Sequence, residues 1–235
     1  ALLPAVAVVG GLAAGLGMAA KAASEDQKAQ ELLAQQLRTS AMATDDVIAS
    51  NEQFISSMSK AFSVADDDLR PAMASLVRST GSVETAQSLM TTALDIAAAT
   101  GKDLETVTLA LGKAANGQTA ALTKLDPSLK GVIDSSSTLD DITGALAVSF
   151  GGAATVAAES FEGRMKGMTI ALDETKESIG AALLPALTGL LGILKPVADW
   201  AQQNTQVFLI FIGVIGALAT AVIAANVAMK IYQAT

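Results

Sequence analysis

The sequence contains no cysteine and no histidine, and aromatic residues make up only 3% of its 235 residues. Without cysteine, the chain can form neither a disulfide framework nor a thiolate metal site. Without histidine, it lacks the commonest general base and the commonest ligand of transition metals. We therefore expect no metal site and no cofactor.

Known catalytic motifs are also missing from the chain. The segments "TGKD" (100–103) and "LGKA" (111–114) lack the second glycine and the Ser or Thr that a phosphate-binding loop places after its lysine. The sequence has no GxSxG nucleophile motif, and it cannot form HExxH without histidine. We predict that the chain is not an enzyme.

Alanine and leucine supply most of the apolar residues, which make up 51% of the chain. Both residues favour helix, whereas β-branched and aromatic residues favour strands. The composition therefore predicts an all-α protein. Together with the residue patterns described below, it predicts extended or loosely bundled helices with short turns, a coiled-coil-like seam and apolar, membrane-competent helices. The net charge of −8 argues against a protein that coats DNA, which needs clustered Lys and Arg. A neutral or acidic wall would still let DNA slide past.

Changes in composition divide the chain into four predicted regions. They are a Gly-rich apolar helix and candidate membrane segment (1–21), short helices with turns (22–150), a hinge with a seam helix and a Pro-interrupted apolar segment (151–204), and an apolar candidate transmembrane helix (205–235). Ala22 to Arg38 reads as a separate polar helix with a narrow apolar stripe. The first residue is not methionine, so we expect a segment of a longer polypeptide.

Turn and cap residues mark the helix ends in the second region (22–150). Thr44 is predicted to cap a helix that runs to about Phe62. In "TGSVE" (80–84) and "TGKDLE" (100–105), Gly should end one helix in the left-handed conformation, and Ser or Asp should cap the next. "TLDD" from Thr138 predicts a capping box. The triplet 66–68, "DDD", lacks the spacing of a calcium loop and is interpreted as a solvated helix start.

The clearest periodic segment follows Gly151 and Gly152. Apolar or small residues recur at spacings of 4, 3, 4, 3, 4 and 3, which is typical of a coiled-coil seam. The predicted seam and oligomer residues are Phe161, Met165, Met168, Leu172 and Ile179, with Thr175 and Ala182 in the same row. This pattern predicts a partner helix, either in the same chain or in a second copy.

Two long uncharged stretches are candidate membrane segments. Ala1 to Ala20 is either a membrane span or a Gly-rich packing helix. Val207 to Met229 would be about 35 Å long as a helix, close to bilayer thickness. The candidate span residues are Val207, Phe208, Phe211, Gly213, Gly216, Ala217, Ala221 and Ala225, and the candidate interface anchors are Trp200, Lys230 and Tyr232.

The order of motifs over about residues 80–230 resembles the core region of tail tape measure proteins of long-tailed (siphovirus-like) bacteriophages. The resemblance is carried by "TGKDLETVTLALGKAANGQTAALTKL" (100–125), the "FGGAA" hinge (150–154), the helix that begins "FEGRM" (161–165), and "KESIGAALLP" (176–185). The apolar run that follows "ADWAQQNTQ" (198–206) also fits this order.

The resemblance implies a structural, non-enzymatic function. Such a protein fills the lumen of the tail tube, where its length templates the tail, and it is ejected at infection to insert into the host membrane and help DNA pass. Its implied partners are other copies of itself, tail tube and tail tip or baseplate proteins, the host membrane, and phage DNA as passing cargo. Its implied location is the virion, inside the tail tube, and then the host envelope or inner membrane. The alternative is a pore-forming or toxin-like helical protein that inserts into membranes.

Overall fold

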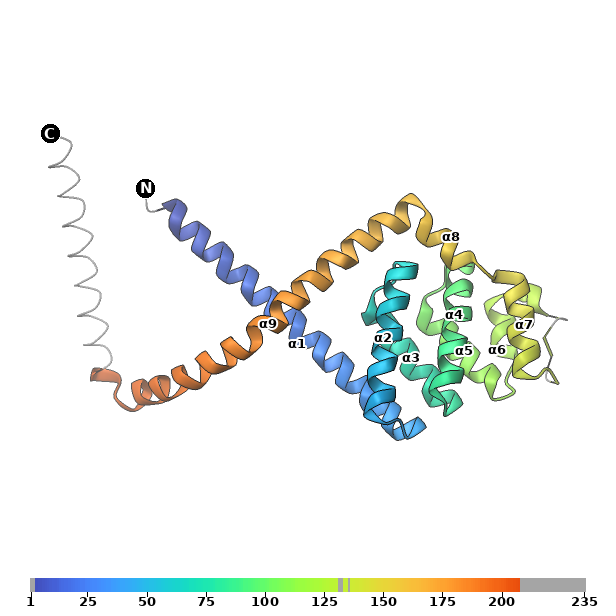
Figure 1. Cartoon of the computed structure of the whole chain (residues 1–235), viewed down its shortest axis with the longest axis horizontal. Helices are drawn as coiled ribbons and strands as arrows, with labels where there is room; N and C mark the ends of the chain where they lie inside the picture. The colour runs from blue at the N-terminus through green and yellow to red at the C-terminus, as the bar shows by residue number, and fades with distance from the viewer. Residues whose placement is uncertain (1–2, 131–132, 135, 208–235) are drawn as a thin grey trace. The chain divides into compact units, whose positions relative to one another are not determined.

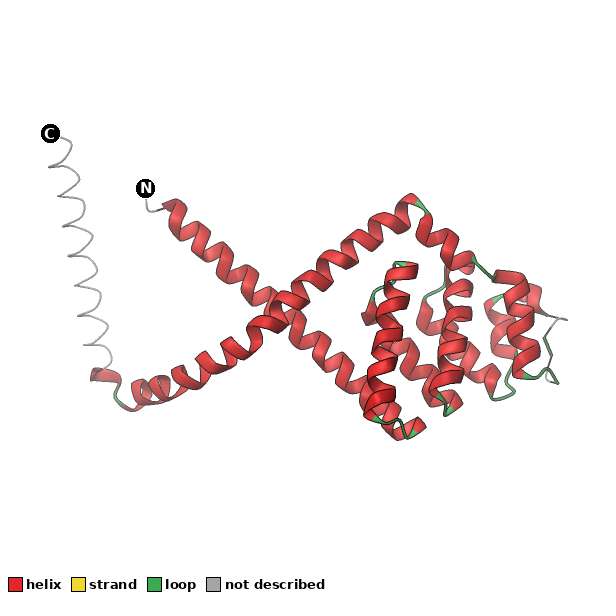
Figure 2. Ribbon diagram, viewed as in Figure 1, coloured by secondary structure: helices red, strands yellow, loops and turns green. Residues whose placement is uncertain are grey.

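The structure is a computed structural model that describes residues 3–130, 133–134 and 136–207. These residues form helices joined by loops, with one isolated bridge between Lys130 and Ile133 (Figure 2). In chain order the elements are α1 (Leu3–Ala41), α2 (Asp45–Phe62), α3 (Asp66–Thr80), α4 (Val83–Thr100), α5 (Leu104–Ala115), α6 (Ala120–Leu125), the 3-10 helix η1 (Pro127–Leu129), α7 (Leu139–Phe150), α8 (Ala153–Glu159) and α9 (Phe161–Gln203). The predicted all-α class is confirmed.

The chain divides into two compact units, Ala1–Ala181 and Ala182–Thr235. The first unit contains helices α1 to α8 and the first half of α9. In the second unit, α9 continues as far as Gln203.

The predicted caps form as the sequence indicated. The Thr44 side chain accepts a hydrogen bond from the backbone N–H of Val47, and α2 runs from Asp45 to Phe62. Gly81 and Gly101 end their helices with φ of 67° and 68°, a left-handed conformation that a side chain would strain. Ser82 and Asp103 then cap α4 and α5, and Thr138 forms a full capping box with Asp141 at the start of α7. These turns fix the short connections within the bundle.

Helix α3 lies at the centre of the first unit and packs against α1, α2, α4 and α5 (Figure 1). Its apolar residues recur at helical spacing on one face, and Leu69, Ala72, Met73, Leu76 and Val77 are each 0% exposed. Helix α4 extends the core to α7 and α8. The core is therefore built from Ala, Leu, Ile, Val and Met, as the composition predicted.

The predicted break near Lys21 is wrong, because α1 is continuous from Leu3 to Ala41. From Met18 to Ala41 this helix contains neither glycine nor proline, so nothing in its sequence interrupts the backbone hydrogen bonds. Of its narrow apolar stripe, Leu33 and Leu37 are buried in the core, whereas Leu32 is exposed.

The predicted interruption by proline is also wrong, because α9 continues through Pro185 and Pro196. A proline inside a helix removes one backbone hydrogen bond and kinks the helix, but it need not end it. The residues around Pro185 are alanine and leucine, which strongly favour helix.

The sequence also did not predict α8, a short helix between the Gly151–Gly152 turn and the seam helix. Both carboxylate oxygens of Asp95, on α4, accept hydrogen bonds from the backbone N–H groups of Gly152 and Ala154 at its start. Ser160 then ends α8 in an extended conformation, and its hydroxyl accepts a hydrogen bond from the N–H of Gly163. A cap supplied by a distant helix has no local signature in the sequence.

Within the described residues, one segment is long and apolar enough to cross a membrane, namely Leu139–Glu159. It comprises α7 and α8, and Ile142, Leu146 and Ala154 from these helices are buried in the core. Only 28% of its apolar window is buried, so part of the segment packs in the core, whereas Val148 and Val156 lie exposed. Of the candidate span, Val207 is described and is exposed. The remaining candidate span residues and the anchors Lys230 and Tyr232 lie outside the described residues.

Candidate functional site

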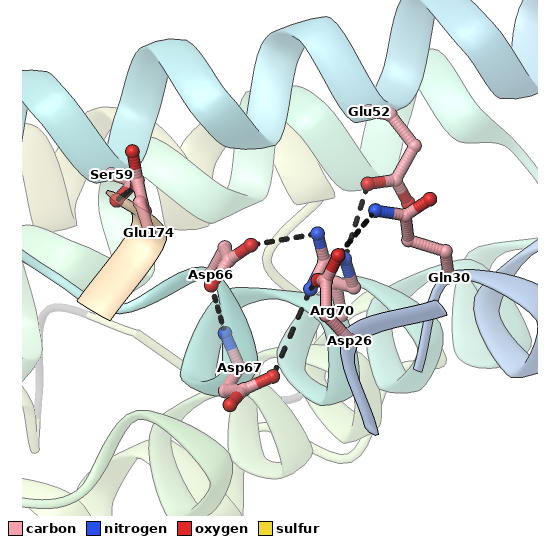
Figure 3. Close-up of polar contacts among 8 residues, drawn as sticks. All are labelled: Asp26, Gln30, Glu52, Ser59, Asp66, Asp67, Arg70 and Glu174. Atoms are coloured by element: carbon pink, nitrogen blue, oxygen red, sulfur yellow. Dashed lines mark hydrogen bonds and ion pairs between the residues drawn. The ribbon is translucent and has the colours of Figure 1, made fainter. Parts of the chain in front are cut away.

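A buried guanidinium surrounded by carboxylates forms where α1, α2 and α3 meet (Figure 3). Arg70 is only 5% exposed. Its Nη1 lies 2.7 Å from Asp26 Oδ1, its Nε lies 3.1 Å from Glu52 Oε2, and its Nη2 lies 2.7 Å from Asp66 Oδ2. Asp67 Oδ1 lies 3.7 Å from Nη1. We call these five residues the Arg70 cluster.

The Arg70 cluster ties three helices together through one cation. Burial alone would lower the pKa of the guanidinium, but the carboxylates, Asp66 first among them, raise it above its ordinary value. Burial, followed by the charge of Asp66, raises the pKa of Asp67. The buried oxygen Glu52 Oε1 accepts no hydrogen bond from the described part of the protein. The cluster therefore holds more negative charge and more acceptor atoms than its single cation satisfies.

The interpretation of the 66–68 triplet needs a correction at Asp66. The three aspartates do occupy the first turn of α3, as predicted, but the Asp66 side chain is only 18% exposed and is paired with Arg70 one turn later. Carboxylate oxygens of Asp26, Asp66 and Asp67 lie within 4.8 Å of one another. Because Arg70 supplies the positive charge for this group, we interpret the arrangement as an ionic tie between helices.

The first half of α9 approaches α1 and α2 at a few points through small and polar residues. The less exposed residues of its first half are Gly163, Gly167, Ile170, Glu174, Glu177 and Gly180, which recur every three or four positions. The buried hydroxyl of Ser59, on α2, donates a hydrogen bond to Glu174 Oε1 over 3.4 Å. At Gly180 the helix crosses α1 so closely that a Cβ would overlap the backbone oxygen of Ala19 (Figure 1).

Burial and neighbouring charge act together on Glu177. Burial is the main cause that raises its pKa to about 7, and the charges of Asp26 and then Asp66 and Asp67 add to it. Arg70 acts in the opposite direction, but it ranks last among the causes. Glu177 therefore extends the acidic surroundings of the Arg70 cluster onto α9.

The predicted seam lies on the exposed side of α9. Phe161, Met165, Met168, Leu172 and Ile179 are between 48% and 78% exposed. The structure thus leaves the apolar row of this helix uncovered and turns its glycine and glutamate face toward the bundle. Such an arrangement is the reverse of an ordinary surface helix, which buries its apolar stripe. Trp200, the described candidate anchor, is 44% exposed in the second unit.

A cavity of about 770 Å³ opens beside the start of α9. Small residues of α4 and α8, such as Ala98 and Ala157, line it together with Asp67, Lys102 and Lys166. Its lining mixes both signs of charge with alanine side chains, so it carries no single chemical preference for a ligand.

Comparison of the chain with models of protein families, with curated proteins and with solved structures found no match. Function must therefore be argued from the chain's own residues and geometry.

The apolar row of α9 was predicted from the sequence, and its role as a seam stays a prediction; the Arg70 cluster was not predicted. The four-residue spacing of Asp66 and Arg70 is a local signal that could have indicated one of its ion pairs. Asp26 and Glu52 come from two other helices, so only the packing of α1 and α2 on α3 brings them to Arg70. The same holds for Glu177, since its surroundings depend on where α9 packs.

Proposed function

We propose that this chain is a segment of a phage tail tape measure protein. In this proposal it occupies the tail tube lumen as a structural, non-enzymatic protein, and its length templates the tail during assembly. At infection it is ejected, and its apolar helices enter the host membrane and help DNA to pass. The order of sequence motifs over about residues 80–230 supports the assignment.

The observation that carries the proposal is the uncovered apolar row on α9. A helix that places Phe161, Met168 and Leu172 in solvent at coiled-coil spacing needs a partner that covers this face. In the lumen of a tube, other copies of the same chain would supply that partner side by side. A protein that assembles with copies of itself is expected to expose such an apolar face while it is a single chain.

The low charge density of the chain is consistent with the other partners in this proposal, which are DNA, the tube and tip proteins and the host membrane. With 16% charged residues and a net charge of −8, the chain has little to retain DNA that slides past it. Tube and tip proteins would then be contacted through the outer faces of the assembled helices. The uncharged run from Val207 to Met229 would supply the membrane step.

Photo-crosslinking in virions tests the proposal. A photoreactive amino acid is placed at Met168 in the gene that encodes the chain, and purified particles are irradiated. We expect covalent dimers of this chain, with the same residue at Glu84, an exposed position on α4, as the control that does not give them. Absence of the chain from purified tails would contradict the proposal.

The alternative, a pore-forming protein that acts alone, shares the uncharged run but needs no phage particle. It predicts leakage of vesicles by the purified chain and no effect on tails. A chain that is missing from particles but permeabilises vesicles would favour this alternative.

A further inference from the structure

Asn116 lies at the end of α5 and joins this helix to the end of α3. Its Nδ2 atom donates two hydrogen bonds, one to the backbone oxygen of Ser79 over 2.9 Å and one to the backbone oxygen of Gly112 over 2.8 Å. Both oxygens belong to the last four residues of their helices, whose carbonyl groups have no regular partner within the helix. The Asn116 amide therefore satisfies a carbonyl group at the end of each helix.

Helices α3 and α5 approach each other closely at the same place. A Cβ at Gly112 would overlap the side chain of Ser79, so this position of α5 has no room for a side chain. Both helices also bury a leucine nearby in the chain, namely Leu76 and Leu111, which are each 0% exposed. The two hydrogen bonds of Asn116 thus lie at the edge of a tightly packed contact.

Asn116 is followed by Gly117, and this pair of residues is chemically labile. The backbone nitrogen of Gly117 can attack Cγ of Asn116, because glycine has no side chain to hinder the approach. A bond forms between this nitrogen and Cγ, and the bond between Cγ and Nδ2 breaks. Nδ2 takes the proton that the backbone nitrogen loses and leaves as ammonia. Water then opens the five-membered imide at either carbonyl carbon: its hydroxyl completes a carboxyl group, its hydrogen returns to the nitrogen, and aspartate or isoaspartate results.

The folded conformation holds the two reacting atoms apart. Closure of the ring needs Cβ of Asn116 and the nitrogen of Gly117 on the same side of the bond between Cα and the carbonyl carbon. At the observed ψ of 21°, the nitrogen lies almost on the opposite side from Cβ. The N–H of Gly117 donates to the oxygen of Ala114, and the N–H of Gln118 donates to the oxygen of Lys113, each over 2.9 Å. The reaction therefore requires the end of α5 to open.

We propose that Asn116 is a deamidation site that the native fold closes and unfolding opens, and that its conversion loosens the contact between α3 and α5. The carboxylate of the product has no hydrogen to donate. It would place negative charge against the backbone oxygens of Ser79 and Gly112, at the negative ends of two helix dipoles. Two hydrogen bonds would become two repulsive contacts. This inference concerns the chemical ageing of the chain and does not rest on the proposed function in a tail.

Mass spectrometry of the unsubstituted chain measures the rate of conversion. The full chain is kept at pH 8, either folded in buffer or unfolded in guanidinium chloride, and a brief digestion with trypsin releases residues 114–124 as one peptide. We expect Asn116 to convert roughly tenfold faster, or more, in the unfolded chain, because the folded chain reacts only through local opening. Asn51 is the internal reference, since the side chain of Glu52 hinders the same attack there. In the unfolded chain, Asn116 should convert roughly tenfold faster than Asn51.

Asn116→Asp tests the consequence of the conversion. Urea unfolding should show that the ratio of folded to unfolded chains falls roughly tenfold, the loss expected from two hydrogen bonds near the surface. Gln118→Glu is the matched control, because Gln118 is an exposed amide two residues further on and undergoes the same change of charge; it should leave the ratio nearly unchanged. Asn116→Ala removes the hydrogen bonds without adding a charge, so it should lose less than Asn116→Asp. An aspartate variant that fails to fold, beside an alanine variant that folds, would agree with the proposal.

Equal rates of deamidation in the folded and unfolded chains would overturn the proposal, because the fold would then give no protection. The same holds if Asn116 converts no faster than Asn51 in the unfolded chain. An Asn116→Asp variant that loses no more stability than Gln118→Glu would also overturn it, since the conversion would then leave the contact between α3 and α5 intact.

Discussion

Replacing Arg70 with methionine tests whether the Arg70 cluster holds the first unit together. Methionine keeps much of the length and apolar stem of arginine but removes the guanidinium. Asp26, Asp66 and Glu52 would then remain close together and partly buried, without their shared cation. Removal of one partner from a buried ion pair typically costs about 3–5 kcal/mol, because the remaining charge stays uncompensated.

The loss of stability should depend on pH in a defined direction. Without the cation, burial and mutual repulsion raise the pKa values of the three carboxyl groups above their values in the unfolded chain. Protonation then favours the folded state, so the variant should regain part of its stability as the pH falls from 7 to 5. The unsubstituted chain keeps its cation, so the deficit of the variant relative to it should shrink at pH 5.

Urea unfolding followed by circular dichroism gives the free energy of unfolding at both pH values. Arg78→Met is the matched control, because Arg78 lies on the same helix but is exposed and donates a hydrogen bond to Gln36 Oε1 near the surface. We expect a loss below about 0.5 kcal/mol for this control. Equal losses for the two variants, or a deficit in Arg70→Met that does not shrink at pH 5, would refute the reasoning.

Two further predictions concern apolar surfaces. Met168→Lys combined with Leu172→Lys should abolish self-association in sedimentation experiments and leave the thermal unfolding midpoint nearly unchanged, because both side chains are more than half exposed; assembly that persists would remove the seam from the account. Leu76→Ala should lower the free energy of unfolding by about 2–5 kcal/mol, since Leu76 is fully buried, whereas Leu32→Ala on exposed surface should change it little. Similar losses from the two alanine variants would contradict the described core.

Local features of this fold were predictable, and contacts between distant helices were not. Thr44, Ser82, Asp103 and Thr138 cap their helices as the sequence indicated, because an N-cap needs only residues within one turn of itself. The apolar row on α9 was equally predictable from its spacing, whereas its role as a seam stays a prediction. The exposure of this row was not predictable, because periodicity identifies an apolar face without saying what covers it.

The Arg70 cluster is a polar example of a contact that local sequence does not predict. An acidic triplet at a helix start usually lies in solvent, and here α1 and α2 cover part of it. The inverted packing of α9 is a second case, because its glycine and glutamate face reads as a surface in the sequence. Both features depend on contacts between distant helices, which the local sequence pattern does not predict.

The length of phage tails tests the proposed function most directly. In-frame deletions in multiples of seven residues within α9, made in the gene that encodes the chain, would preserve the seam register. Because a helix rises 1.5 Å per residue, tails measured by electron microscopy should shorten by about 1.5 Å for each deleted residue, averaged over the series. Tails of unchanged length, in particles that carry the shortened protein, would contradict the proposal that this chain measures them.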